Sequence, residues 1–184
     1  MKKKIVLFLI LFLFFNSIIF SKNIELLLNK EYTYKILKYL KRAKHEVIIS
    51  SFMWCCSPEK YGSFPCKILD EVIHLVKRGV KVEIILETDI NSDNRCNKVI
   101  PLIFKHTLLK HYKNLKIFFD DPLKRSHQKI VLIDGYIVFL GSHNITQSAL
   151  KYNNEVSVLI KSKDIYKKLK NYLENLLVTA TEVY

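Results

Sequence analysis

The apolar positions of this chain follow two periods, one typical of strands and one typical of helices. Short apolar or alternating runs predict strands, and apolar residues spaced three and four apart predict helices. The expected strands are residues 47–52, 80–86, 116–119, 130–133, 136–140 and 154–160. The expected helices are residues 31–44, 66–78, 99–111 and 163–177. Because helices and strands alternate, we predict an α/β fold with a mixed β-sheet flanked by helices on both faces.

The amino-terminal segment differs from the rest of the chain. Three lysines are followed by residues 5–20, which are apolar with two interruptions, and this order predicts an export signal. Ser21 offers a small residue for cleavage, but no Ala-x-Ala pattern precedes it. A retained membrane anchor, lengthened by residues 26–28, therefore stays open beside a cleaved signal peptide. We expect residues 1–21 to serve export or anchoring, and residues 22–184 to form one domain that is secreted, periplasmic or membrane-anchored outside the cytoplasm.

The chain is strongly basic. Lysine and arginine outnumber aspartate and glutamate by 30 to 17, which gives a formal net charge of +13. Such a charge favours polyanions, so nucleic acid is the first expected partner and an anionic membrane surface the second. The alternative is a lysine-rich surface that faces only solvent. A phosphodiester site elsewhere in the chain would favour nucleic acid.

Four cysteines, Cys55, Cys56, Cys66 and Cys96, occur in a chain that we expect to be exported, and this context favours disulfide bonds. We expect Cys55 or Cys56 to bond with Cys66, because the adjacent pair is poorly placed to bond with itself. Free buried thiols are one alternative. A zinc site that includes a nearby histidine is another, although no C-x2-C spacing supports it.

Polar residues gather in one hairpin that is otherwise apolar. They form the pattern H-x-K-x4-D-x6-G-S-x-N, made by His127, Lys129, Asp134, Gly141, Ser142 and Asn144. On an extended strand, His127 and Lys129 leave the same face. Imidazole can attack phosphorus and lysine can bind the nonbridging oxygens, while Ser142 and Asn144 add hydrogen-bond donors where negative charge develops. This chemistry requires neither a metal nor a cofactor.

Other residues of this region have supporting roles. Asp134 and Gly135 separate two apolar runs, so we expect Asp134 to shape a hairpin turn. Gly141 would let the backbone approach a bound phosphate. An acceptor must fix the tautomer of the histidine, and Glu155 is the candidate.

Neighbouring side chains leave alternatives open. Lys124 and Arg125 precede the pattern and could contact a nucleic-acid backbone or simply face solvent. His143 could line the cleft or point away from it. Trp54 is expected in the core, with stacking on a base as the alternative.

With every position of the pattern filled, the segment resembles the HKD motif of the phospholipase D superfamily. The chain is similar to the small bacterial and archaeal nucleases that carry one such motif, with a weaker resemblance over roughly residues 31 to 178. The resemblance implies a phospholipase D-like fold. It also implies that His127 is the nucleophile, that Lys129 and Asn144 bind phosphate, and that Glu155 orients the histidine. Ser142 would support them, and Asp134 belongs to the catalytic set as the aspartate of the motif.

A homodimer follows from the same resemblance, because the family mechanism uses two motifs and this chain has one. One histidine attacks phosphorus and the other protonates the leaving oxygen, so a two-fold axis would bring two copies of His127 into one cleft. We predict a metal-independent phosphodiesterase, a nonspecific endonuclease that hydrolyses DNA or RNA through a phosphohistidine. The alternatives are a phospholipase D or phosphatidyl transferase acting on membrane lipids, and an inactive nucleic-acid-binding module.

Overall fold

The computed structural model describes residues 23–56, 62–88, 95–108 and 112–184, so the expected export segment lies outside the described residues. The strands are β1 (Ile24–Leu28), β2 (Glu46–Ser51), β3 (Lys81–Leu86), β4 (Leu115–Phe119), β5 (Lys129–Ile133), β6 (Ile137–Gly141), β7 (Val156–Lys161) and β8 (Thr181–Glu182). The helices are α2 (Lys30–Arg42), α3 (Phe64–Lys77), α4 (Arg95–Leu108), α5 (Gln147–Lys151) and α6 (Lys163–Leu176).

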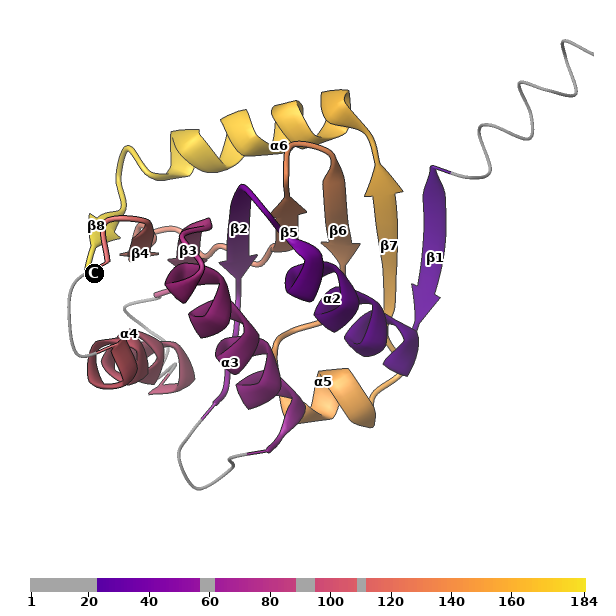
Figure 1. The fold of residues 1–184 in the computed structure, drawn as a ribbon, viewed down its shortest axis with the longest axis horizontal. Helices are drawn as coiled ribbons and strands as arrows, with labels where there is room; N and C mark the ends of the chain where they lie inside the picture. Colours follow the sequence, from indigo (N-terminus) through magenta and orange to yellow (C-terminus); the bar gives the residue numbers. More distant parts are fainter. Residues whose placement is uncertain (1–22, 57–61, 89–94, 109–111) are drawn as a thin grey trace, which may run out of the picture.

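All eight strands form one mixed sheet in the order β1-β7-β6-β5-β2-β3-β4-β8. Strand β2 pairs in parallel with β3, and β3 in parallel with β4, through crossovers that contain α3 and α4. The other pairs are antiparallel. Figure 1 shows α2 and α3 side by side in front of this sheet. The expected mixed sheet is confirmed.

Alternation along the central strands gives the sheet two buried faces. On one face, Ile49 and Val131 join the large core formed with α2, α3 and α4. On the other, Ile48 and Leu132 pack in a smaller cluster with Leu173 of α6. Burial on both sides explains why the central strands read as nearly continuous apolar runs. Helices therefore cover both faces, as predicted.

The register brings the ends of several strands, including those nearest the motif, to one edge of the sheet. Strands β1, β2 and β6 end there, whereas β5 and β7 begin there (Figure 1). We call this border the site edge; it is marked by Leu28, Ser51, Lys129, Gly141 and Val156. Because the polar positions of the motif flank β5 and β6, most of them lie at this edge.

The hairpin turn between β5 and β6 lies at the opposite edge. Ile133 pairs with Ile137, so three residues form the turn. Asp134 and Gly135 adopt φ angles of 52° and 73°, a left-handed conformation that glycine and aspartate tolerate better than most residues. The expected hairpin is confirmed.

Two disulfides tie the segment after β2 to the helices that follow. Cys56 bonds with Cys66 in α3, and Cys55 bonds with Cys96 in α4. The bond between Cys56 and Cys66 is one of the two that we predicted. All four cysteines are in disulfides, and the described chain has no free cysteine. No thiol is therefore available for a zinc site, and the alternative of free buried thiols is wrong.

The pattern did not predict β1, α5 or β8. Residues 26–28, considered above as an extension of an anchor, lie in β1 and pair with β7. Across the described ranges, no helix combines the length and the apolar character that a membrane crossing requires.

Candidate active site

His127 and Lys129 lie together at the start of β5. The Nζ atom of Lys129 is 3.0 Å from Nδ1 of His127 and donates a hydrogen bond of 2.7 Å to its backbone oxygen. His127 is exposed, whereas Lys129 is only 8% exposed. Gln128, between them, points to the other face and donates to Ser50 Oγ. The two side chains lie together as predicted, with the imidazole open to solvent and a buried cation behind it.

Phe52 completes this corner of the site. Its ring lies 4.3 Å from the imidazole of His127, measured between centroids, and Lys129 Nζ is 4.8 Å from the same ring. The backbone N–H of Phe52 donates to the oxygen of Gln128, which fixes the end of β2 against the start of β5. An aromatic ring beside the cation and the imidazole restricts both side chains.

Burial favours the neutral forms of both groups, and neighbouring charges add to this effect for His127 but oppose it for Lys129. Burial, followed by the charges of Lys129 and Arg125, lowers the pKa of His127, and the charge of Glu87 opposes this effect. Burial also lowers the pKa of Lys129, against the charge of Glu155. A neutral imidazole retains the free electron pair that a nucleophile or general base needs.

Ser142 and Glu155 form a second polar group at the site edge. Ser142 donates its hydroxyl to Glu155, and its Oγ accepts from Val156 N at 3.1 Å. Glu155 also accepts from Asn153 Nδ2 at 3.1 Å. Among the described residues of one chain, no hydrogen bond joins Glu155 to His127. Within a single chain, the described contacts of Glu155 therefore do not support the prediction that it orients the histidine.

Two buried polar atoms near this group lack a hydrogen-bond partner among the described residues. They are Ser51 Oγ, in the strand beside Lys129, and one amide atom of Asn144. A bridge between Trp54 and Ile145 holds the Asn144 segment against the extension of β2. Buried polar atoms normally have hydrogen-bond partners. The Ser51 hydroxyl can donate to a phosphate oxygen. The amide of Asn144 can do the same if its oxygen and nitrogen exchange places, which places the nitrogen at the unpaired position.

Gly141 is close to β7. A Cβ atom at this position would overlap the backbone and side chain of Ser157. The sequence suggested that this glycine gives access to phosphate; the structure supplies a different reason for it, the close contact between β6 and β7.

Asp134 lies at the other end of β5 from Lys129. Its carboxylate accepts backbone N–H groups from Lys44, His45 and Glu46 at 2.9, 2.8 and 3.0 Å. These bonds join the hairpin to the start of β2. The structure thus separates the aspartate of the motif from the histidine and the lysine, and gives it the turn-shaping role that we expected.

His143 and Trp54 are internal. His143 is 1% exposed, stacks on Tyr32 with centroids 4.3 Å apart, and contacts Ser157 Oγ at 2.7 Å and the Asn29 oxygen at 2.9 Å. Trp54 is fully buried and donates its indole N–H to the Pro65 oxygen. Core packing of Trp54 is confirmed, and His143 is buried against Tyr32, Ser157 and Asn29.

Two buried acids close to the site were not predicted. Glu87 and Asp120 follow the carboxyl ends of β3 and β4, and each is 2% exposed. Asp120 accepts from Thr88 N at 2.7 Å, and burial raises its pKa to about 6. The available signal was an acid directly after an apolar strand, a position that parallel strands bring to a common edge.

A family model described as "Cardiolipin synthase, PLD-like domain" matches residues 36–177. The chain belongs to the phospholipase D-like family. The resemblance carried by the HKD motif is therefore confirmed.

Relatives of this phospholipase D-like protein have different names. "Phospholipase D" of Rickettsia prowazekii is 30% identical over 117 residues, which cover 64% of this chain and 51% of that protein. The "Virion nicking-joining enzyme" of Vaccinia virus is 29% identical over 112 residues, which cover 61% of this chain and 25% of that protein. The chain spans about half or less of the length of these relatives.

Among solved structures, the phospholipase D family member Nuc from Salmonella typhimurium matches with a TM-score of 0.70. The match covers 87% of this chain and 97% of Nuc at 16% identity. At this identity the likeness shows a shared fold.

Proposed function

We propose that this protein is a metal-independent phosphodiesterase, a nonspecific endonuclease that hydrolyses DNA or RNA through a phosphohistidine in a homodimer. The observation that carries the proposal is the exposed imidazole of His127 with the buried ammonium of Lys129 3.0 Å away. A nucleophile and a cation for nonbridging oxygens lie together at the start of β5 in a phospholipase D-like fold.

The proposed reaction has two displacements. An unprotonated ring nitrogen of His127 attacks phosphorus, the phosphorus–oxygen bond breaks, and a second His127 protonates the leaving oxygen. That histidine then removes a proton from water, which attacks phosphorus and breaks the phosphorus–nitrogen bond. The proton given in the first step returns in the second, so both histidines end as they began.

The homodimer supplies the second histidine. It also offers a role for Glu155, which contacts Ser142 rather than His127 within one chain. In a two-fold arrangement, the carboxylate could accept from the imidazole of the opposite chain and fix its tautomer. A large excess of inert His127→Ala chains should therefore suppress wild-type activity, once dimers have exchanged.

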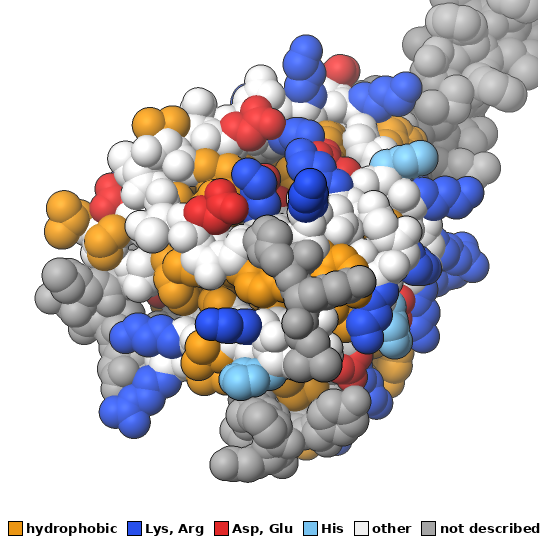
Figure 2. All heavy atoms as spheres, turned by 60° about the vertical axis from the view of Figure 1, so that its left-hand side comes forward, with side chains coloured by type: hydrophobic (Ala, Val, Ile, Leu, Met, Phe, Trp, Pro, Cys, Tyr) orange, Lys and Arg blue, Asp and Glu red, His pale blue; other side chains and the backbone are white. Residues whose placement is uncertain are grey.

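Charge favours nucleic acid over lipid as the substrate. Lysines and arginines lie across the face shown in Figure 2, and the formal net charge is +13. A nucleic acid carries one negative charge on each phosphate, so several lysines and arginines can bind one strand at the same time. The virion enzyme among the relatives is described as nicking and joining, which also supports this substrate.

A lipid substrate is the second candidate, because relatives named phospholipase D share the family. The apolar amino-terminal segment would favour that function if it anchors the domain at a membrane. Either function agrees with export, and the two disulfides are typical of proteins that leave the cytoplasm.

Cleavage of single-stranded DNA, duplex DNA, RNA and phosphatidylcholine in EDTA tests the proposal. His127→Ala should abolish turnover, whereas His74→Ala, at an exposed position of α3, should not. Nucleic-acid cleavage by the wild type that is lost only in His127→Ala supports the nuclease. Turnover of lipid alone replaces it with the phospholipase, and activity that EDTA removes and a metal restores contradicts the mechanism.

A further inference from the structure

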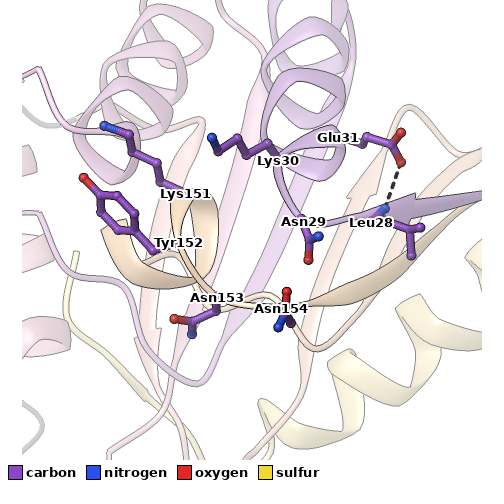
Figure 3. Close-up of a pocket in the computed structure, with 8 residues that line it drawn as sticks. All are labelled: Leu28, Asn29, Lys30, Glu31, Lys151, Tyr152, Asn153 and Asn154. Atoms are coloured by element: carbon purple, nitrogen blue, oxygen red, sulfur yellow. Dashed lines mark hydrogen bonds between the residues drawn. The ribbon is translucent and has the colours of Figure 1, made fainter.

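A polar pocket lies beside the site edge, between residues 28–31 at the start of α2 and residues 151–154 after α5. Its volume is about 470 Å³. Figure 3 shows the side chains of Lys30, Lys151 and Tyr152 on one side and three asparagines below them. None of these residues belongs to the HKD motif.

The two lysines of the pocket have no acidic partner among the residues that the structure describes. No described carboxylate forms an ion pair with Lys30 or Lys151. The one acid that lines the pocket, Glu31, accepts the backbone N–H of Leu28 at 2.9 Å, and Figure 3 shows it directed away from Lys30. Two cations that line one pocket without a described carboxylate partner attract an anion such as a phosphate group.

Tyr152 adds an aromatic surface to these charges. It is 68% exposed, and Lys151 Nζ lies 5.0 Å from its ring centroid. An exposed ring beside cations suits nucleic acid, because every base can stack on it while lysine binds the backbone. Only an unpaired base has a free face for such stacking, so the chemistry selects single strands over duplexes.

Hydrogen bonds connect the pocket to the site edge. Asn153 donates to the carboxylate of Glu155 at 3.1 Å, and Asn29 Oδ1 accepts the backbone N–H of Glu155 at 2.9 Å. The start of β5 and the end of β1 are separated by three strand spacings, about 14 Å at about 4.8 Å each. At the rise of a stacked, duplex-like strand, about 3.4 Å per nucleotide, about four nucleotides span this distance from His127, and a more extended single strand needs fewer.

We propose that this pocket is an accessory nucleotide subsite for single-stranded nucleic acid. Lys30 and Lys151 bind a phosphate a few nucleotides from the one that is cleaved, and Tyr152 stacks a base. This inference rests on the proposed nuclease function, and it names the strand form that the enzyme prefers.

Binding tests the subsite without requiring catalysis. In full-length His127→Ala protein, fluorescence anisotropy would measure the Kd of a labelled single strand of about 12 nucleotides and of its duplex. Tyr152→Ala should raise the single-strand Kd about 5- to 150-fold, whereas Tyr152→Phe should restore it. The duplex Kd should change much less. Tyr172→Ala, at an exposed tyrosine of α6, is the aromatic control, and Lys167→Ala on the same helix is the control for Lys151→Ala.

The dependence on substrate length provides a second readout. A dinucleotide is too short to reach the pocket from His127, so in Tyr152→Ala the ratio of kcat/KM for the long strand to that for the dinucleotide should fall. An unchanged single-strand Kd, or an equal loss for strand and duplex, overturns the subsite even if the enzyme is a nuclease. If wild type cleaves no nucleic acid, the nuclease proposal fails, and the anisotropy series still decides whether the pocket binds single strands.

Discussion

Lys129 holds its Nζ 3.0 Å from Nδ1 of His127 while it donates to the backbone oxygen of the same residue. The cation is thus placed against the candidate nucleophile before any phosphate is bound. It can stabilise the added negative charge of the transition state, and it also disfavours protonation of the imidazole. One side chain therefore affects both phosphate binding and the pKa of its neighbour.

Replacing Lys129 should separate these two effects. After burial, the charge of Lys129 is the largest factor that lowers the pKa of His127. Lys129→Gln removes the charge, so the pKa of His127 should rise, and the imidazole should become protonated at a higher pH. NMR titration of the His127 ring protons measures the shift, and kcat/KM should fall by at least about 100-fold through loss of a charged phosphate contact.

Lys168→Gln, at an exposed position of α6, is the matched control and should change neither quantity. A pKa of His127 that stays the same or falls in Lys129→Gln would contradict the electrostatic coupling. A loss of activity without a pKa change would leave phosphate binding as the only role of the lysine.

Asp134 should matter for stability more than for chemistry. Burial alone would raise the pKa of its carboxyl, but hydrogen bonds from Glu46, His45 and Lys44 hold the pKa below its ordinary value. The stabilisation is therefore present above the unfolded-state pKa and is lost as pH falls through the folded-state pKa. Asp134→Ala should lower the free energy of unfolding at pH 7 by roughly 2–4 kcal/mol, and the difference from wild type should shrink in acid.

Urea denaturation at several pH values measures this loss, and Asp134→Asn, which keeps one acceptor oxygen, should lose less. At a temperature where both variants are folded, kcat should stay within a few-fold of wild type. A fully folded Asp134→Ala protein without activity would instead assign a catalytic role to the aspartate.

The sequence was most informative where both faces of an element are determined by burial. The central strands β2, β3 and β5 are buried on both sides, so their apolar runs and the helices between them were predicted to within a few residues. Strand β1 exposes every residue except Leu27 and has no clear alternation, so only its pairing with β7 identifies it. The two-residue β8 and the five-residue α5 are too short to produce a period.

In the candidate site as well, contacts between residues close in sequence were predicted, and contacts that depend on tertiary packing were not. His127 lies two residues before Lys129, the first residue of β5, so their proximity followed from a spacing of two. Glu87 and Asp120 each follow an apolar strand, but their approach to the site depends on the parallel pairing of β2, β3 and β4, which is not local in sequence. The pairing of Cys55 with Cys96 likewise depends on where α4 packs, 41 residues along the chain.

The two disulfides should differ in their contributions to stability. The bond between Cys55 and Cys96 closes a span of 41 residues, and that between Cys56 and Cys66 a span of 10. In the chain-entropy model, the longer loop restricts the unfolded chain more, by about 4 kcal/mol against about 3 kcal/mol. Urea denaturation of the two paired Cys→Ala variants measures the losses. A greater loss for the shorter loop would show that native packing around Cys56 and Cys66 outweighs loop entropy.

Asp120 should make the protein less stable as pH rises. Burial raises its pKa to about 6, above the ordinary value of 3.8, so the folded state binds the proton more tightly than the unfolded state. Its contribution is therefore most favourable below about pH 4 and is lost as pH rises through 6. Asparagine stays neutral and keeps an oxygen for Thr88 N, so Asp120→Asn should unfold like wild type near pH 4 and be more stable at pH 8, by up to about 3 kcal/mol.

Urea denaturation at the two pH values tests this expectation, with Asp70→Asn on α3 as the control for loss of a carboxylate elsewhere. A stability difference for Asp120→Asn that is the same at both pH values would contradict a raised pKa. Because Asp120 and Glu87 are both buried and lie next to the segment that leads into His127, a stabilised Asp120→Asn protein with a slower reaction would show that the enzyme keeps an unfavourable buried charge for its effect on the site.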